Sequence, residues 1–281
     1  MTHAWDPDRY LAFADERGRP FLDLLQRIGA TSPRRVVDLG CGPGNLTALL
    51  ARRWPGADVL GVDSSPEMLE RALAEDLPGV RFELGDVRTW APAGSRDVPL
   101  DRPVDRPVAQ PVDVMVANAT YQWVPDHLEL LPRLVGQVAP GGWFAFQVPG
   151  NHREPSHLLL HELAEDPRFS SWTRGVARPH SHDPRVYAAA LLDLGLSVDV
   201  WETTYLHLLT GADPVFSWIS GTGARPTLAA LPDEERATFV EEYKSLLREA
   251  YPPGPHGTLL PFRRVFAVAR VPGVAERAAG H

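Results

Sequence analysis

The chain of 281 residues contains a single cysteine, Cys41, and lacks any apolar run of the roughly 18 residues that a membrane-spanning helix needs. One cysteine cannot form an internal disulfide, which suits a reducing cytoplasm. The first residues also lack the charged-then-apolar pattern of a signal peptide. We therefore expect a cytoplasmic protein without a membrane span.

Positive charge is also scarce, because 28 Lys and Arg residues stand against 36 Asp and Glu, a formal net charge of −8. Binding to a phosphate backbone needs a basic stripe, so nucleic acid is a poor candidate partner. An anionic small molecule would instead need a local cluster of Arg or His.

Hydrophobic residues make up 44% of the chain, and their pattern alternates buried strands with amphipathic helices. This alternation predicts a single α/β domain over residues 1–281, with a doubly wound, mostly parallel sheet. The long alternating segments at 197–209 and 258–271 predict further strands of the same sheet. Strands are predicted within 34–40, 57–63, 80–86, 112–118 and 141–150.

Four segments lie outside this alternation. Residues 1–30 predict two helices, joined by a turn at Gly18 and Pro20. Residues 91–112 contain the tandem Asp-Arg-Pro-Val and predict an extended surface insertion, because regular proline removes backbone donors. Residues 151–181 and 211–254 predict helices that cover one end of the sheet as a lid.

The glycine-rich segment at 36–45, VVDLGCGPGN, is the most specific signal. Gly40 and Gly42 lie in a tight turn between strand and helix, where the absence of side chains lets a ligand lie against the backbone. Dinucleotide-binding folds also have a glycine-rich turn here, but with a wider third step than Gly-x-Gly-x-Gly. Asp38 would repel a pyrophosphate, whereas a zwitterionic amino-acid group offers it an ammonium.

Acidic residues end the next two predicted strands. Asp63 lies where an acid binds ribose hydroxyls in the crevice of α/β sheets, and the alternative is a carboxylate that caps the following helix. Asp86 is placed to accept a hydrogen bond from an adenine amino group.

The loop from Asp38 to Asn45, Asp63 and Asp86 resemble, in order, three motifs of the class I S-adenosylmethionine-dependent methyltransferases. The resemblance covers residues 34–150 and implies a seven-stranded sheet with one antiparallel strand. It also implies S-adenosylmethionine as the cofactor and S-adenosylhomocysteine as the product. In this family the loop holds the methionine part, the second acid the ribose and the third acid the adenine.

The cofactor site that the resemblance implies extends beyond these acids. It includes the N-terminal helices within 1–30, which fold over the cofactor in this family. Cys41 is expected to be a small loop residue rather than a nucleophile, because nothing basic is near it in sequence. The cofactor-binding residues expected are Asp38, Gly40, Cys41, Gly42, Asp63, Ser64, Asp86, Val87, Asn118, Trp123 and Tyr10.

The segment 118–127, NATYQWVPDH, would border the transferred methyl group. Enzymes that methylate base amino groups have an Asn-Pro-Pro-Tyr loop here, which stacks a flipped base. In this chain Ala119 and Thr120 replace both prolines. Together with the acidic net charge, this argues against a nucleic-acid acceptor.

Segments from end to end, among them NATYQWVPDH, VPGNHREPSH and GTGARP, resemble the branch of this family that methylates a small tricarboxylate. The resemblance implies methyl transfer to a carboxylate of trans-aconitate, which gives a monomethyl ester. A carboxylate is already a nucleophile at neutral pH, so no catalytic general base is expected, only alignment and exclusion of water. The insertion at 91–112 and Tyr121, which replaces a more usual aliphatic residue, depart from the pattern.

Arginine suits the binding of a polycarboxylate, because its planar fork pairs bidentately with a carboxylate. Arg263 and Arg264 are neighbours on a strand and point to opposite faces, so at most one faces the pocket. Each candidate has a plain structural alternative, a solvated charge or a core aromatic. The substrate residues expected are Arg225, His152, Arg153, Arg264, Tyr205, Trp201 and Tyr121, with Trp218 as a further wall.

His157 and His161 are four residues apart on a predicted helix, the spacing of metal ligands. The segment lacks the Glu of the zinc-protease motif and a third ligand, so no metal is expected. Three other functions remain open: a methyltransferase for another small acid or hydroxyl, a nicotinamide-binding oxidoreductase, and a non-catalytic partner-binding protein.

Overall fold

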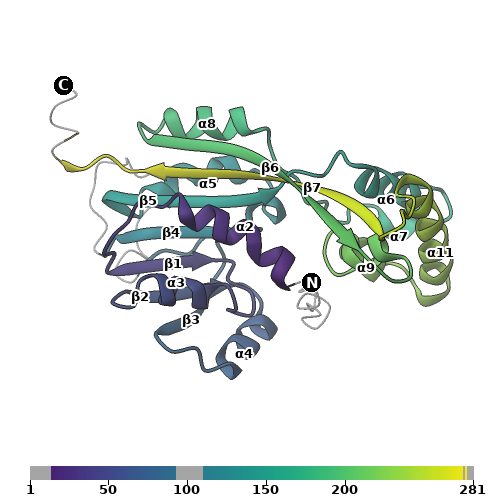
Figure 1. The fold of residues 1–281 in the computed structure, drawn as a ribbon, viewed down its shortest axis with the longest axis horizontal. Helices are drawn as coiled ribbons and strands as arrows, with labels where there is room; N and C mark the ends of the chain where they lie inside the picture. The colour runs from purple at the N-terminus through teal and green to yellow at the C-terminus, as the bar shows by residue number, and fades with distance from the viewer. Residues whose placement is uncertain (1–13, 93–109, 275, 277–281) are drawn as a thin grey trace.

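Seven strands form one sheet in the computed structural model, which describes residues 14–92, 110–274 and 276, and the side chains from residue 18 onward. The strand order is β3-β2-β1-β4-β5-β7-β6. Strands β1 to β5 pair in parallel, and β7 is antiparallel to both neighbours. The fold predicted from the sequence is therefore confirmed (Figure 1). The strands are β1 (Arg35–Leu39), β2 (Asp58–Asp63), β3 (Val80–Leu84), β4 (Val112–Asn118), β5 (Val138–Pro149), β6 (Ser197–Leu209) and β7 (Thr258–Arg270).

Helices cover both faces of this sheet. On one face, α5 (His127–Val135) and α8 (Pro184–Leu192) pack on side chains of β1, β4, β5 and β7. On the other, α2 (Ala14–Gln26) and α3 (Thr47–Arg53) pack on the alternate residues of the same strands. The central strands are apolar on both faces for this reason. Helix α4 (Pro66–Ala74) lies beside β2 and β3 at the sheet edge.

Two helices begin where the sequence places a cap. The Ser65 hydroxyl accepts the backbone N–H of Met68 at 3.2 Å, and Pro66 follows at the first helical position. The Asp183 carboxylate accepts the N–H of Arg185 in the same way before Pro184. Proline is favoured there because the first N–H groups of a helix have no partner within it.

The turn expected at Gly18 and Pro20 is not formed, because α2 continues through Pro20 as one helix from Ala14 to Gln26. An internal proline costs a helix about 3 kcal/mol. Burial of a Phe or Leu side chain contributes about 1.5–3 kcal/mol. Phe21, Leu24 and Leu25 are all buried against the sheet, so packing outweighs the local penalty.

Strands β6 and β7 run past the other strands and carry a second layer of helices at their far end (Figure 1). This region has its own core, in which Phe169 and Phe239 pack with Leu260 and Phe262 from β7. We interpret it as the lid predicted at 151–181 and 211–254. Its helices are α6 (Pro155–Glu165), α7 (Ser170–Thr173), α9 (Pro214–Ser220), α10 (Arg225–Ala230) and α11 (Asp233–Ala250).

Tyr10 and most of the predicted insertion, residues 93–109, lie outside the described residues. The N-terminal cover of the cofactor and the surface insertion therefore stay predictions. Among the described helices, none combines the length and the apolar character needed to cross a membrane.

Candidate active site

A cavity of about 490 Å³ lies between the carboxyl ends of the parallel strands and the lid. This volume falls within the range of small-molecule sites, about 300–1,000 Å³. All the predicted cofactor residues that the structure describes line it. Away from the glycine loop it is lined by Pro149, Asn151 and His152 and by residues of α9, α10 and β7. The cavity thus joins the glycine loop to the lid.

The glycine loop follows β1 and turns sharply toward β2. Gly40 has a φ of +75°, and a Cβ there would lie 2.2 Å from Oγ1 of Thr120, so only glycine fits. Gly42, with a φ of +57°, has open space where a Cβ would be. Its backbone therefore faces the cavity uncovered, as close approach of a ligand requires.

Asp38 is the buried acid of this loop. One carboxylate oxygen accepts the Thr47 hydroxyl at 2.7 Å, while Oδ1 has no hydrogen-bond partner among the described residues. Burial raises the pKa of Asp38 to about 7, opposed by the Thr47 bond and assisted by the nearby Asp63. A buried carboxylate oxygen without a partner suits an ammonium, so the residue fits the amino-acid part of S-adenosylmethionine.

Asp63 and Asp86 end the neighbouring strands. The Asp63 carboxylate accepts the N–H groups of Gly42 at 2.8 Å and Ser65 at 2.9 Å. Burial raises the pKa of Asp63, although these bonds oppose it. Ser65, not Asp63, caps α4, which removes the helix-cap alternative. Asp86 is paired with Arg88, whose hydrogen bond lowers the pKa of the carboxyl.

The two adjacent arginines of β7 point to opposite sides, as the strand alternation predicts. Arg264 is buried, lines the cavity, donates to Oε1 of Gln147 at 3.3 Å and lies 4.6 Å from the Phe262 ring centre. Arg263 donates instead to Glu202 on β6 at 3.0 Å and lies outside the cavity lining. Arg264 is therefore the arginine of this pair that faces the cavity.

The lid adds one arginine and two neutral histidines. Arg225 begins α10 and lines the cavity. Burial lowers the pKa of His152 to about 4 and that of His157 to about 3, so both are neutral at pH 7. Their rings meet edge to face at 5.5 Å. They offer hydrogen bonds to a ligand, while the two arginines supply the charge.

Four predicted substrate residues lie outside the described lining. Tyr121 is 1% exposed and packs in the core between His127 and Phe146, because its short 3-10 helix η1 (Tyr121–Trp123) turns the ring away from the cavity. The ring of Trp201 stacks on Phe266 at 4.7 Å. The Tyr205 hydroxyl donates to Asp23 on α2, and Arg19 lies over its ring. Arg153 is exposed. Of the predicted substrate residues, Arg225, His152 and Arg264 therefore line the described cavity and these four do not.

Other lining residues were not predicted from the sequence. Thr120 and Gln122 come from the corner after β4, Asn151 follows β5, and Thr222 precedes α10. The side-chain oxygens of Gln122 and Asn151 are buried without a hydrogen-bond partner among the described residues, so they are available to a ligand. The corner itself was a sequence signal, but the sequence does not show which of its side chains turn inward.

Mutation of Tyr121 tests whether this residue belongs to the core or to the acceptor site. Its buried hydroxyl has no hydrogen-bond partner among the described residues. Because an unsatisfied buried hydroxyl is destabilising, Tyr121→Phe is expected to raise the free energy of unfolding by about 1 kcal/mol. The relative rates with different acceptors should not change, because the ring lies outside the cavity lining. Urea denaturation and an acceptor panel measure both; an altered acceptor preference would return Tyr121 to the site.

The buried His157 predicts a dependence of stability on pH. Its pKa of about 3 in the folded protein lies below the unfolded value of 6.5, so the unfolded chain binds more protons as pH falls below about 6.5. Between pH 7.5 and pH 5 this lowers the free energy of unfolding by about 2 kcal/mol. Asp38 acts in the opposite direction, because its pKa is raised by folding.

The difference between the parent protein and His157→Gln isolates the histidine, because the Asp38 effect is common to both. Urea denaturation at several pH values should give the variant a smaller loss of stability on acidification. Parallel curves for the two proteins would show that His157 titrates normally.

The topology and the loop geometry together define a class. A doubly wound seven-stranded sheet with antiparallel β7, a glycine turn after β1 and acids after β2 and β3 is the arrangement of the class I S-adenosylmethionine-dependent methyltransferases. Solved structures share the fold. A phosphoethanolamine N-methyltransferase 2 from Haemonchus contortus in complex with S-adenosyl-L-methionine superposes with a TM-score of 0.51 at 18% identity, covering 91% of this chain and 52% of that longer one. A putative methyltransferase from Bacillus halodurans gives 0.52 at 13% identity, covering 90% and 99%.

Sequence relatives define the particular family. A family model described as a methyltransferase domain matches residues 13–199. A trans-aconitate 2-methyltransferase from Streptomyces avermitilis is 50% identical over 275 residues, covering 95% of this chain and 96% of the relative. The protein of that name from Mycobacterium tuberculosis H37Ra is 45% identical, covering 98% of this chain and 100% of the relative. The chain belongs to the trans-aconitate 2-methyltransferase family of methyltransferases.

Proposed function

We propose that this protein transfers the methyl group of S-adenosylmethionine to a carboxylate of trans-aconitate, giving a monomethyl ester and S-adenosylhomocysteine. The proposal rests on the family to which the chain belongs and on the charges that line its cavity. The binding roles given to individual residues below are part of the proposal.

The separation of charge along the cavity carries the proposal. Asp38, Asp63 and Asp86, the last paired with Arg88, line the end formed by the parallel strands, whereas Arg225 and Arg264 line the end formed by α10 and β7. The acidic end favours a ligand with an ammonium and a sulfonium. The arginine end favours carboxylates, because a guanidinium pairs with them bidentately. A cationic cofactor and a polyanionic acceptor thus have separate places in one cavity.

Methyl transfer to a carboxylate needs little from the protein beyond position. S-Adenosylmethionine, when bound, supplies an electrophilic methyl group. The acceptor oxygen is already nucleophilic at neutral pH, so the chain needs to align it and keep water away. Arg225 and Arg264 would hold carboxylates that do not react. Trp218 and Phe262 provide apolar walls beside them.

The amide side chains near the glycine loop offer finer positioning. Asn118, Gln122 and Asn151 line the cavity, and each has a buried oxygen without a hydrogen-bond partner among the described residues. Such oxygens can accept from a protonated carboxyl or from the cofactor's ammonium, and so favour one orientation of the ligand. Neutral His152 and His157 add hydrogen bonds without adding charge.

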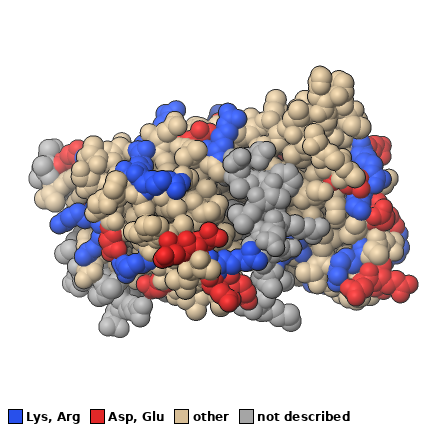
Figure 2. Space-filling model, turned by 60° about the horizontal axis from the view of Figure 1, so that its bottom comes forward, with Lys and Arg blue, Asp and Glu red and all other residues tan. Residues whose placement is uncertain are grey.

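A small acceptor is favoured over a nucleic acid. On the face shown in Figure 2, Lys and Arg side chains are interspersed with Asp and Glu rather than gathered in a stripe. The formal charge of −8 also disfavours binding to a phosphate backbone. A dinucleotide in place of S-adenosylmethionine is disfavoured because its pyrophosphate would approach the Asp38 carboxylate.

The test is incubation of the protein with S-adenosylmethionine and a panel of acids, followed by mass spectrometry. The panel contains trans-aconitate, cis-aconitate, citrate and a monocarboxylic acid, and one hydroxyl metabolite without a carboxylate. We expect a product heavier by one methylene, formed fastest from trans-aconitate. Binding of S-adenosylmethionine with no trans-aconitate ester would refute the acceptor while leaving the class intact. A faster reaction with another member of the panel would identify the alternative acceptor.

A further inference from the structure

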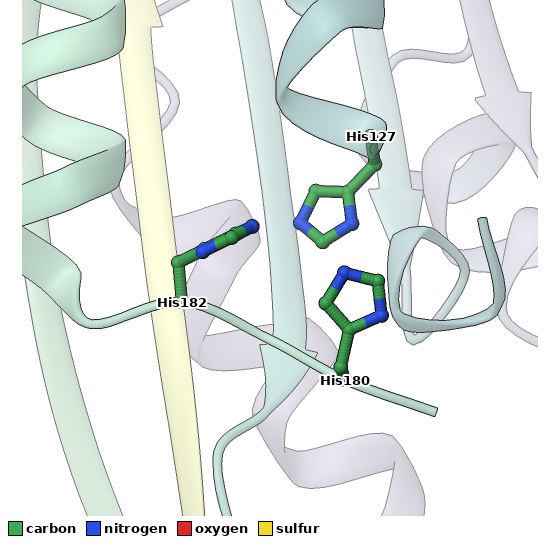
Figure 3. A group of neighbouring side chains, drawn as sticks. All are labelled: His127, His180 and His182. Atoms are coloured by element: carbon green, nitrogen blue, oxygen red, sulfur yellow. The ribbon is translucent and has the colours of Figure 1, made fainter. Parts of the chain in front are cut away.

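Three histidines from distant parts of the chain meet behind the cavity wall. His127 begins α5, while His180 and His182 precede α8. One ring nitrogen of each lies within 4.8 Å of the other two, and the ring centres are 5.1, 5.1 and 5.6 Å apart. In Figure 3 a nitrogen of each ring points toward the space between the three. None of them lines the cavity described above, so methyl transfer does not account for the group.

His127 is fully buried and held in one orientation. Its Nδ1 lies 3.1 Å from the carbonyl oxygen of Val124, which requires that Nδ1 carries the proton. Nε2 therefore carries the lone pair of the ring, which can accept a hydrogen bond or bind an ion. Burial lowers the pKa of His127 to about 4, so the ring is neutral at pH 7. A metal-binding histidine is usually neutral: one ring nitrogen binds the metal, and the other donates its N–H to a partner such as a backbone carbonyl.

The other two histidines lie on a short segment without regular secondary structure, residues 176–183. They are two residues apart, and two such residues in an extended chain face the same way. The N–H of His180 donates to the carbonyl of Gln122 at 3.0 Å, which holds this segment against η1. Both rings are only half-buried, so an ion has a path from solvent.

The Tyr187 hydroxyl lies beside the three histidines. The Tyr187 hydroxyl lies 2.8 Å from Nε2 of His127 and accepts the backbone N–H of His182 at 3.1 Å. It therefore donates its proton to Nε2 in the absence of an ion. When an ion takes that lone pair, the hydroxyl can turn to a bound water. Three imidazoles with one further oxygen form the tetrahedral set that zinc prefers.

We propose that His127, His180 and His182 bind a divalent transition-metal ion, for which Zn²⁺ is the appropriate probe. Zinc–nitrogen bonds of about 2.0–2.1 Å place tetrahedral ligands about 3.3 Å apart, so the rings need to close by roughly an ångström or less per ring. Imidazole ligands suit Zn²⁺, Cu²⁺ and Ni²⁺ better than Mg²⁺ or Ca²⁺.

The ion would act on the cavity wall rather than on the methyl group. Ala177 and Pro179, on the segment that leads to His180, line the cavity, and the His180 N–H holds Gln122, another lining residue. A metal that fastens this segment to α5 therefore fixes part of the wall between cavity and solvent. The proposal does not depend on which acid the enzyme methylates.

Zinc titration of the untagged, chelator-treated full chain tests the site, with calorimetry as the readout. We expect one equivalent to bind, and Co²⁺ in its place to give the visible absorption of a tetrahedral ion. His180→Gln and His182→Gln should each weaken binding by more than the roughly 10–100-fold that loss of a supporting partner costs. His256→Gln, which changes an exposed histidine, and His161→Gln, which changes one of the two histidines on α6, should bind as the parent does.

Proteolysis gives a second, independent measurement. Arg174 is exposed just before the segment and is followed by Gly175, so trypsin should cleave after it, and Zn²⁺ should slow this cleavage at least severalfold in the parent and in His256→Gln. In His182→Gln the same zinc should leave the rate unchanged, which also controls for effects on trypsin. Equal zinc affinity in the parent, His180→Gln and His182→Gln would overturn the proposal, as would the absence of saturable binding to the parent.

Discussion

Arg264→Ala is expected to lower kcat/KM for trans-aconitate by about two orders of magnitude or more while affinity for S-adenosylmethionine changes little. Arg264 is buried and lines the cavity from β7, where it donates to Gln147 on β5. Removal of one member of a buried, hydrogen-bonded charge pair costs about 2–5 kcal/mol, which corresponds to roughly 30- to 5,000-fold. The acceptor carboxylate would lose its partner, whereas the cofactor's contacts lie at the other end.

Arg263→Ala is the matched control, because it removes the same side chain from the next position of the same strand. Arg263 pairs with Glu202 and lies outside the cavity lining, at 28% side-chain exposure. An exposed pair of this kind contributes only about 0–1 kcal/mol to stability. We expect near-normal kinetics for this variant. Arg225→Ala should resemble Arg264→Ala in direction, with a higher KM and unchanged cofactor affinity.

Two further measurements separate a binding role from a structural one. Arg264→Lys keeps the charge but loses the bidentate fork, so it should recover part of the activity. Added guanidinium should partly restore Arg264→Ala at saturating cofactor. Equal kcat/KM in Arg263→Ala and Arg264→Ala, with both proteins folded by circular dichroism, would show that Arg264 does not bind the acceptor.

The contrast between these two arginines also shows how far the sequence predicts the site. Alternation along a strand predicts that only one of two neighbours faces the pocket, but not which one. That choice depends on the register of β7 against β5 and β6, in which Arg264 is level with Pro149 and Thr203. Register is a tertiary property, because it is fixed by how three distant strands pair.

The end of the cavity that we propose for the cofactor can be predicted from local sequence for a physical reason. The glycine turn and the acids after β1, β2 and β3 each lie within a few residues of a strand end, and parallel strands bring their carboxyl ends to one edge. The aromatic residues of the acceptor side are different. Tyr121, Trp201 and Tyr205 are as suited to a core as to a pocket, and packing against Phe146, Phe266 and Asp23 decided their places. The histidine group required His127 to meet a segment more than 50 residues away, which local pattern does not predict.

Asp38→Asn is expected to weaken S-adenosylmethionine binding by about two orders of magnitude. The variant keeps the size of the side chain and an oxygen for the Thr47 hydroxyl, but it loses the negative charge. The buried oxygen without a partner among the described residues, Oδ1, is the group suited to the cofactor's ammonium. Charge-assisted hydrogen bonds contribute about 1.5–3 kcal/mol, and more when both partners are desolvated. Thr47→Val separates the two contributions, because it removes the hydrogen bond from the Thr47 hydroxyl to Asp38 and leaves the Asp38 side chain in place.

The pH dependence of cofactor affinity tests the same contact without relying on the loss of a side chain. The pKa of Asp38 is about 7 in the free protein, because burial and nearby Asp63 favour the protonated form. A protonated carboxyl cannot pair with an ammonium, so the proton must leave before the cofactor is held. Affinity should therefore rise with pH up to about 7, with a loss of up to about tenfold for each unit below, and fall again above about pH 8, where the free cofactor's own α-amino group loses its proton.

Calorimetry between pH 5.5 and pH 8.5 in buffers of different ionisation enthalpy measures both the affinity and the proton released. The parent should release close to one proton per cofactor at pH 6 and few at pH 7.5. Asp38→Asn should release almost none at either pH, because the titrating group is gone. Asp86→Asn is the control, since its Arg88 partner already holds the pKa of that carboxyl below its usual range, so it is ionised throughout and the parent's proton release should persist. A pH-independent affinity in the parent would place the cofactor's ammonium elsewhere in the cavity.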